Sequence, residues 1–198
     1  MATQTRTAVA AAVAMVLITA ATPAASDGRG RIVLSVENRC RMPQLLLEAA
    51  QQKAATFYDE IGVDLVWFPA GVAPPPELTG SLQLRVVLPD NATEKTILAA
   101  LAASGRSAAP VGIAPRGTSD VYVFCGRITS RPAVVNVATV LGRALAHEIG
   151  HQVLPGMGHS DTGIMRGILD YGKGRAPGFT DTQTQSIQAL LVAHRTRP

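Results

Sequence analysis

The sequence predicts a single layered domain of the α+β class, close to α/β. Three observations predict it. Segments with strand-like and helix-like patterns alternate along the chain instead of falling into separate halves. The 198 residues correspond to one domain of ordinary size. Hydrophobic residues make up 47% of the chain, which is enough to form a core without a framework of disulfide bonds.

The charge distribution argues against a nucleic-acid-binding protein. The formal net charge is +4, from 18 basic and 14 acidic side chains. These basic residues are spread along the chain and form no basic run, which is the usual sign of a nucleic-acid-binding surface. We therefore expect no nucleic-acid partner.

The N-terminus has the pattern of an export signal. A short head, Met1–Thr7, carries one cation, and an almost wholly apolar run of 14 residues follows from Ala8 to Ala21. The small-residue segment Thr22–Ser26 then offers a cleavage site. The apolar run is shorter than the roughly 20 residues that span a bilayer. An uncleaved membrane anchor is the alternative interpretation.

Cleavage of a signal peptide at residues 1–25 leaves residues 26–198 as one mature domain. We expect it to be secreted or periplasmic in a bacterium, monomeric, and without stable membrane insertion. In such a compartment Cys40 and Cys125 can form a disulfide. Two separate buried thiols remain an equal alternative at this point, because geometry decides the pairing.

The first half of the mature chain predicts two strands separated by a helix. Arg31–Glu37 is strand-like, and apolar residues recur at three- and four-residue steps within Pro43–Ile61. Gly62 ends that helix. The strand Val63–Phe68 follows, and Pro69–Gly80 is a proline-rich loop.

The middle of the chain predicts three further strands. Leu82–Leu88 and Val121–Cys125 are rich in β-branched and aromatic residues. Thr93–Ala103 is a short helix or a helical loop. Val111–Ala114 is short and flanked by Gly and Pro, which is typical of an edge strand.

The last third of the chain predicts two helices. One runs over Val134–Leu154 and is stopped by Pro155–Gly156. The other begins at the capping box Thr180–Gln183 and continues to about His194. The stretch between these helices is irregular.

The first of these helices carries the motif His147-Glu148-Ile149-Gly150-His151. Residues four apart lie on one helix face, so both imidazoles can reach one metal ion. Glu148, beside the first ligand, can then reach a metal-bound water. Three of the four histidines in the chain lie within the 13 residues from His147 to His159. This concentration favours a metal site over surface histidines.

The third ligand is expected to be His159, because the glycine-bearing turn after the helix can bring it back to the first two. Asp161 and Asp170 are the alternatives. No glutamate follows Glu148, which excludes a site that takes a downstream glutamate as its third ligand. Three histidines with an open position are the ligand set of catalytic zinc.

These motifs resemble the metzincin metallopeptidases. The resemblance rests on the two helical histidines, the turn Gly156-Met157-Gly158-His159, and Gly163-Ile164-Met165, which is similar to the family's methionine turn. His159–Arg166 also resembles a motif of small exported bacterial proteins. Seven residues separate His151 from His159, two more than the family's usual spacing.

The resemblance implies a twisted mixed five-stranded sheet backed by two long helices, with a small irregular C-terminal subdomain that ends in a helix. It implies that His147, His151 and His159 bind zinc and that Met165 lies beneath the metal as a floor. Glu148 is then the catalytic residue. The predicted edge strand would pair with an extended substrate through its backbone, over Val111, Gly112, Ile113 and Ala114.

The predicted function is therefore a secreted or periplasmic zinc endopeptidase. It would hydrolyse peptide bonds of a peptide or protein substrate with a zinc-bound water that Glu148 activates. The alternative is a zinc-binding domain of the same fold that is not catalytic and has a structural or partner-binding role. A closed site with Asp161 as fourth ligand would favour that alternative.

Overall fold

The fold is that of a computed structural model, which describes residues 28–105, 110–130, 136–168 and 177–196. The predicted signal peptide at residues 1–25 lies outside these ranges. Within them, no helix is both long and apolar enough to cross a bilayer.

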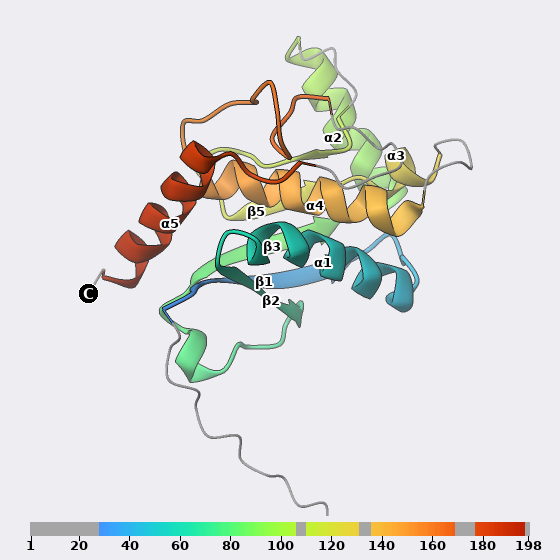
Figure 1. The fold of residues 1–198 in the computed structure, drawn as a ribbon. Coiled ribbons are helices and arrows are strands. Elements are labelled where there is room, and N and C mark those ends of the chain that lie inside the picture. Colours follow the sequence, from blue (N-terminus) through green and yellow to red (C-terminus); the bar gives the residue numbers. More distant parts are fainter. Residues whose placement is uncertain (1–27, 106–109, 131–135, 169–176, 197–198) are drawn as a thin grey trace, which may run out of the picture.

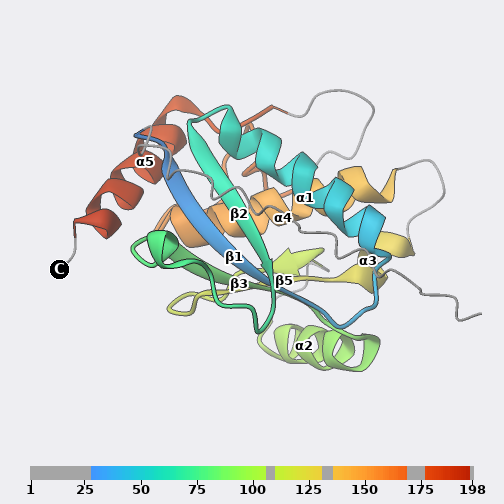
Figure 2. The ribbon, with the colours of Figure 1, turned by 90° about the horizontal axis from the view of Figure 1, so that it is seen from below.

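Five strands form one mixed sheet in the order β2-β1-β3-β5-β4 (Figures 1 and 2). Neighbouring strands are parallel except for the short edge strand β4, which is antiparallel to β5. The strands are β1 (Gly30–Asn38), β2 (Val63–Pro69), β3 (Leu82–Leu88), β4 (Gly112–Ile113) and β5 (Asp120–Val123). The predicted mixed five-stranded sheet is thus confirmed.

Two long helices, α1 and α4, lie side by side on one face of the sheet (Figure 1). The apolar core lies between them and the inward-facing residues of the strands. The helices are α1 (Gln44–Asp59), α2 (Asn91–Ala103), α3 (Cys125–Thr129), α4 (Val137–Val153) and α5 (Asp181–Arg195), with a short 3-10 turn, η1 (Pro76–Leu78), in the proline-rich loop.

The close packing of α1 and α4 fixes the position of the helix that carries the histidine motif. A Cβ atom added at Gly142 of α4 would lie 2.5 Å from the Cβ of Lys53 and 2.7 Å from the carbonyl oxygen of Ala50. Only glycine therefore permits this approach. Four residues further along α4, the Ala146 carbonyl accepts a 3.1 Å hydrogen bond from the Tyr58 hydroxyl. These contacts hold α4 at the point where the histidine motif begins.

The last predicted strand of the sheet extends too far at its C-terminal end. The pattern predicts Val121–Cys125 as a strand, but β5 ends at Val123 and Cys125 begins the short helix α3. The apolar run continues through the buried Phe124 and Cys125 although the backbone turns, because both side chains still enter the core. The predicted edge strand Val111–Ala114 has only Gly112 and Ile113 in strand conformation.

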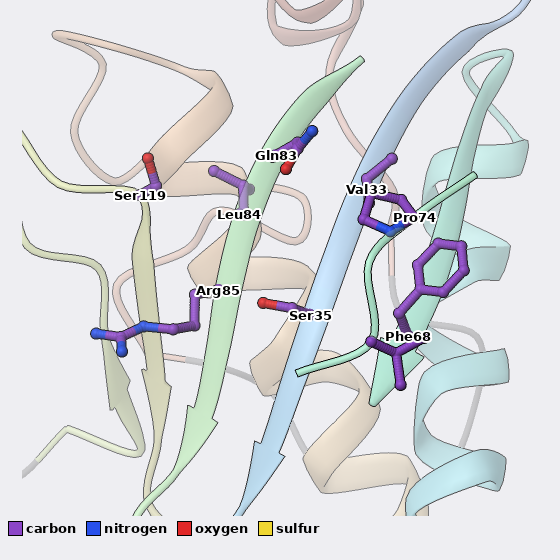
Figure 3. Close-up of a pocket in the computed structure, with 9 residues that line it drawn as sticks. Val33, Ser35, Phe68, Pro74, Gln83, Leu84, Arg85 and Ser119 are labelled. Atoms are coloured by element: carbon purple, nitrogen blue, oxygen red, sulfur yellow. The ribbon is translucent and has the colours of Figure 1, made fainter. Parts of the chain in front are cut away.

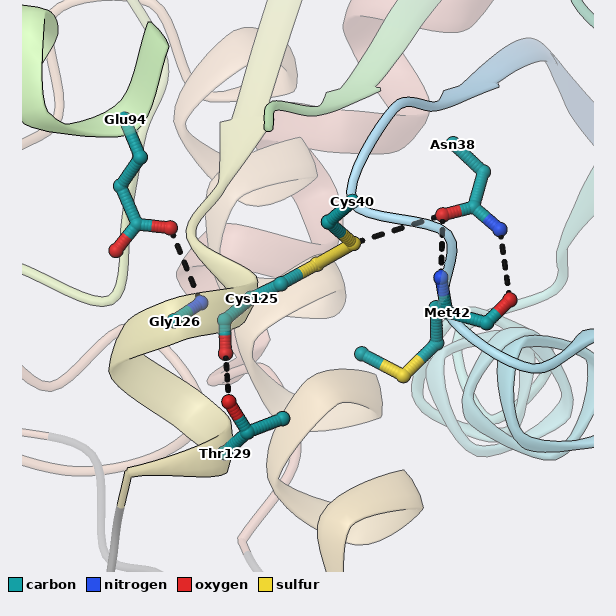
Figure 4. The surroundings of a disulfide bond; sticks show 7 residues. All are labelled: Asn38, Cys40, Met42, Glu94, Cys125, Gly126 and Thr129. Atoms are coloured by element: carbon teal, nitrogen blue, oxygen red, sulfur yellow. Dashed lines mark hydrogen bonds between the residues drawn. A yellow bond between two sulfur atoms is a disulfide. The ribbon is translucent and has the colours of Figure 1, made fainter. Parts of the chain in front are cut away.

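The two cysteines form a disulfide, which resolves the alternative that the sequence leaves open (Figure 4). Cys40 lies in the turn after β1, and Cys125 lies at the start of α3. The first turn of α3 is also held by α2, because the Gly126 backbone N–H donates a 3.0 Å hydrogen bond to the buried Glu94 carboxylate. The disulfide joins the turn after β1 to α3, and the Glu94 carboxylate joins α2 to α3.

The other face of the sheet carries a shallow cavity of about 290 Å³ (Figure 3). It is lined by outward-facing residues of β1 and β3, including Ser35 and Arg85, and by Phe68 and Pro74 beside them. Arg85 is paired there with Asp120 through two 2.9 Å hydrogen bonds. Since side chains alternate between the faces of a strand, this cavity is separated from α4 by the sheet itself.

Candidate metal centre

Helix α4 presents two histidines and a glutamate at its C-terminal end. Asn136 caps the N-terminus of the helix, and its side chain accepts a hydrogen bond from the Thr139 N–H. His147 and Glu148 are each only 4% exposed, and His151, one turn later, is half-buried. The helix ends at Val153 with Leu154 as its C-cap, just before Pro155, which cannot continue the hydrogen-bonding pattern.

The chain then turns back and brings His159 to the other two histidines. Gly156 adopts a positive φ of 81°, which glycine tolerates without steric cost. The Nε2 atom of His151 lies 3.1 Å from that of His147 and 3.2 Å from that of His159. The two additional residues in this turn therefore do not prevent convergence, and His159 is the third member of the cluster, as predicted.

The spacing of the three nitrogen atoms fits a tetrahedral zinc ion. Ligand nitrogens at about 2.0–2.1 Å from a tetrahedral zinc ion are separated by about 3.3 Å. No described aspartate, including Asp161, belongs to the cluster. The other alternative ligand, Asp170, lies outside the described residues. The structure therefore brings together three imidazoles that could hold one metal ion.

Two features prepare His147 as a ligand. Its Nδ1–H donates a 2.8 Å hydrogen bond to the carbonyl oxygen of Ile164, and we assign the tautomer from that acceptor. This leaves Nε2 unprotonated and directed at the other two histidines. Burial lowers the pKa of His147, while the bond to Ile164 acts in the opposite direction.

Burial also lowers the pKa of His151 to about 4, and repulsion from His147 and His159, whenever they are protonated, and from Arg116 acts in the same direction. Both α4 imidazoles are therefore neutral at neutral pH. A neutral imidazole is the form that binds a metal ion.

Met165 lies directly against α4 at Gly150, the residue before His151. It is completely buried, and a Cβ atom added at Gly150 would overlap its Sδ atom. Its carbonyl oxygen accepts a 2.9 Å hydrogen bond from the Ser160 N–H, which closes the turn beside His159. The structure thus places Met165 in contact with α4 at Gly150, and its role as a floor beneath a metal stays a prediction.

Helix α5 supports the same turn. The Gln183 side chain accepts a 2.9 Å bond from the Thr180 N–H within the capping box and donates a 3.1 Å bond to the Ser160 hydroxyl. The sequence predicts the capping box but not its link to Ser160, because the link joins residues 23 positions apart. Gln183 therefore connects the last helix to the residue next to His159.

The Glu148 side chain lies against the edge strand. A Cβ atom added at Gly112 would be 2.6 Å from the Cγ atom of Glu148 and 3.0 Å from its Cδ atom. Burial raises the pKa of Glu148 to about 8. Across the described ranges, no group donates a hydrogen bond to its carboxylate. The predicted catalytic residue and the predicted edge strand are therefore direct neighbours.

The edge strand is short but anchored on one side. Gly112 and Ile113 pair with Val123 and Tyr122 of β5. The Val111 carbonyl accepts a 2.8 Å hydrogen bond from the Phe124 N–H. In the described part of the sheet no strand pairs with the other side of β4.

Comparison with known proteins gives similarities to solved structures but no match in sequence. The sequence matches no known protein family, and no curated protein sequence matches it. The fold is similar to the crystal structure of archaemetzincin from Methanopyrus kandleri, with a TM-score of 0.44 and 15% sequence identity. The match covers 85% of this chain and 98% of that chain. This similarity is too low to transfer a function, so the functional residues are assigned from the geometry of this chain.

Proposed function

We propose that this protein is a zinc-dependent endopeptidase that acts outside the cytoplasm. The observation that carries this proposal is the convergence of three imidazole Nε2 atoms at the spacing of tetrahedral zinc ligands. Three histidine ligands leave one coordination position for water or substrate, which is the arrangement of catalytic rather than structural zinc.

The residues of the chain have distinct roles in this reaction. Zinc, when bound, makes water more acidic and polarises a carbonyl group. The charge of bound zinc would lower the raised pKa of Glu148, so that its carboxylate could take a proton from the attacking water and deliver it to the leaving amine. The unpaired side of β4 offers backbone groups to an extended peptide next to Glu148. Met165 supports the imidazoles from below and takes no part in the chemistry.

The absence of a fourth protein ligand among the described residues favours an enzyme over a structural zinc domain. Asp161 is the obvious candidate for closing the site, but it is exposed and lies outside the histidine cluster. A domain that used zinc only for stability would have its coordination completed by the protein.

Two observations support a site of action outside the cytoplasm. The first is the sequence pattern of residues 1–25, which has the order of a secretory signal. The second, which is weaker, is the disulfide between Cys40 and Cys125, since such bonds persist in oxidising compartments. Mass spectrometry of the exported protein should place its N-terminus near residue 26, and an N-terminus at Met1 would contradict this part of the proposal.

The function is tested by measuring zinc content together with cleavage of a broad peptide library. The wild-type protein should hold about one zinc ion per chain and cleave within peptides. Glu148→Gln should keep the zinc and lose hydrolysis, because the amide cannot act as a base. The exposed residue Glu77, in η1, offers a matched control, since Glu77→Gln makes the same chemical change far from the cluster.

Two results would contradict the proposal. Equal cleavage by the wild type and Glu148→Gln would exclude the mechanism. An X-ray absorption spectrum that shows four protein ligands on the bound zinc would instead support the non-catalytic alternative.

A further inference from the structure

Gln152, the residue after His151, joins the metal-binding helix to the loop between β4 and β5. Its side-chain amide donates a 2.7 Å hydrogen bond to the carbonyl oxygen of Asp120 and a 3.2 Å bond to that of Pro115. A glutamine amide carries two N–H groups, so it can donate hydrogen bonds to both carbonyl oxygens at once. The side chain is partly buried, which shields these bonds from exchange with water.

The two carbonyls stand at the two ends of that loop. Pro115 lies two residues after the end of β4, and Asp120 is the first residue of β5. Within the loop, Thr118 donates to the Pro115 carbonyl and accepts from the Asp120 N–H. The loop is therefore closed on itself, and Gln152 attaches this closed unit to α4.

Strand β4 has few other attachments. It pairs with β5 over two residues, and the Phe124 N–H adds one bond to Val111. Its other side has no partner strand in the described part of the chain. Because few hydrogen bonds hold β4, the two hydrogen bonds from Gln152 contribute strongly to the distance between β4 and Glu148.

We propose that Gln152 is a positioning residue that holds the edge strand at the correct distance from the metal cluster for a peptide to bind between them. This inference rests on the proposed peptidase function. Gln152 does not touch the reacting atoms; it acts through β4. An edge strand that is ordered before the peptide arrives binds it without the entropic cost of ordering the loop.

Glu is the most informative replacement, because Gln152→Glu keeps the shape and turns both donors into acceptors that face two carbonyl oxygens. We expect the KM for a long extended peptide to rise roughly tenfold, as the loss of two hydrogen bonds implies. The kcat should stay within about twofold, and the zinc content should stay at one per chain. A short substrate that does not reach β4 should show no change in KM.

Gln188 provides the matched control. Its side-chain amide donates a 2.9 Å hydrogen bond from α5 to the Ile61 carbonyl, and it is also partly buried. Gln188→Glu makes the same change away from the cluster and should leave KM unchanged. Equal effects of the two substitutions on KM, or a fall in kcat with KM unchanged for Gln152→Glu, would overturn the proposal.

Hydrogen–deuterium exchange supplies a readout that needs no activity. In Gln152→Glu the amides of residues 111–124 should exchange faster than in the wild type, whereas Gln188→Glu should affect only the surroundings of Ile61. Unchanged exchange in residues 111–124 would overturn the coupling itself. If the wild type cleaves no peptide but Gln152→Glu still exchanges faster in residues 111–124, the proposed function has failed. The coupling between Gln152 and the edge strand then still stands.

Discussion

Two glutamates of this protein are almost equally buried but have opposite surroundings. Glu94 is 6% exposed and accepts a hydrogen bond from the Gly126 N–H at the start of α3, beside the disulfide (Figure 4). Glu148 is 4% exposed and lies against Gly112 of the edge strand, and no described group donates a hydrogen bond to it.

The difference separates a buried carboxylate that has a hydrogen-bond partner from one that has none among the described residues. Burying a carboxylate is unfavourable unless hydrogen bonds replace those it made with water. At Glu94 the backbone supplies such a bond, and the side chain helps to hold α2 against α3. At Glu148 the pKa is instead raised, to about 8, and such unfavourable environments are typical of active sites.

The largest expected effect is on catalysis at Glu148. Loss of a general base typically lowers the rate by about 10²–10⁴-fold, so Glu148→Gln should lower kcat by at least about 100-fold. The same substitution should not lower the melting temperature of the metal-free protein, because burial already raises the pKa of Glu148 and no described group donates a hydrogen bond to the side chain that is replaced. A lower melting temperature would mean that Glu148 is a structural residue like Glu94.

The disulfide beside Glu94 should have the largest effect on stability. It closes a sequence separation of 85 residues, and bonds of this kind typically contribute about 2–5 kcal/mol. Replacement of Cys40 and Cys125 by Ser should lower the free energy of unfolding by that amount, measured by urea titration. Reduction of the wild type should give the same midpoint, and a midpoint unaffected by reductant would contradict the prediction.

Removal of the Glu94 carboxylate tests the other half of the comparison. Glu94→Ala leaves the Gly126 N–H without its partner, which costs about 1–3 kcal/mol. The melting temperature should fall, while kcat/KM of the folded protein should be retained. Glu77→Ala, at an exposed position, is the control and should have little effect on either quantity. A fall in kcat/KM of the folded protein for Glu94→Ala would remove the distinction between the two glutamates.

The smallest expected effect is on the free energy of unfolding, and it comes from the partly exposed carboxylate of Asp120. Hydrogen bonds from Arg85 lower the pKa of Asp120, so the pair stabilises the fold above the pKa of the unfolded chain. That contribution disappears as pH falls through the lower pKa of the folded state. Since Arg85 is half exposed, we expect less than about 1 kcal/mol. Stability curves of wild type and Asp120→Asn should differ slightly at pH 7 and converge in acid; a constant gap would contradict this.

The sequence predicts the regular elements and the members of the histidine cluster well. Helices α1, α4 and α5 follow from apolar periodicity and end signals, which are local properties of the chain. The three histidines are recognisable because their side chains carry the chemistry and because a turn with glycine links them.

The remaining features depend on contacts between distant segments. The pairing of Cys40 with Cys125 needs β1 and α3 to lie together. Gln152 bonds to residues 32 and 37 positions away, and Gln183 bonds to a residue 23 positions away. The sequence around a glutamine gives no indication of such distant partners. The sequence pattern does not reveal the short helix α3, because its buried residues continue the apolar run of β5.

The link between Gln183 and Ser160 has a consequence for the order in which the protein is assembled. The turn that carries His159 is held from behind by the capping box of α5 and by the bond from the Ile164 N–H to the Gly178 carbonyl. Chains are synthesised from the N-terminus and fold as their segments become available. We therefore expect the histidine cluster to gain this support only after residues 178–183 have emerged, so that a shorter chain containing all three histidines still lacks it.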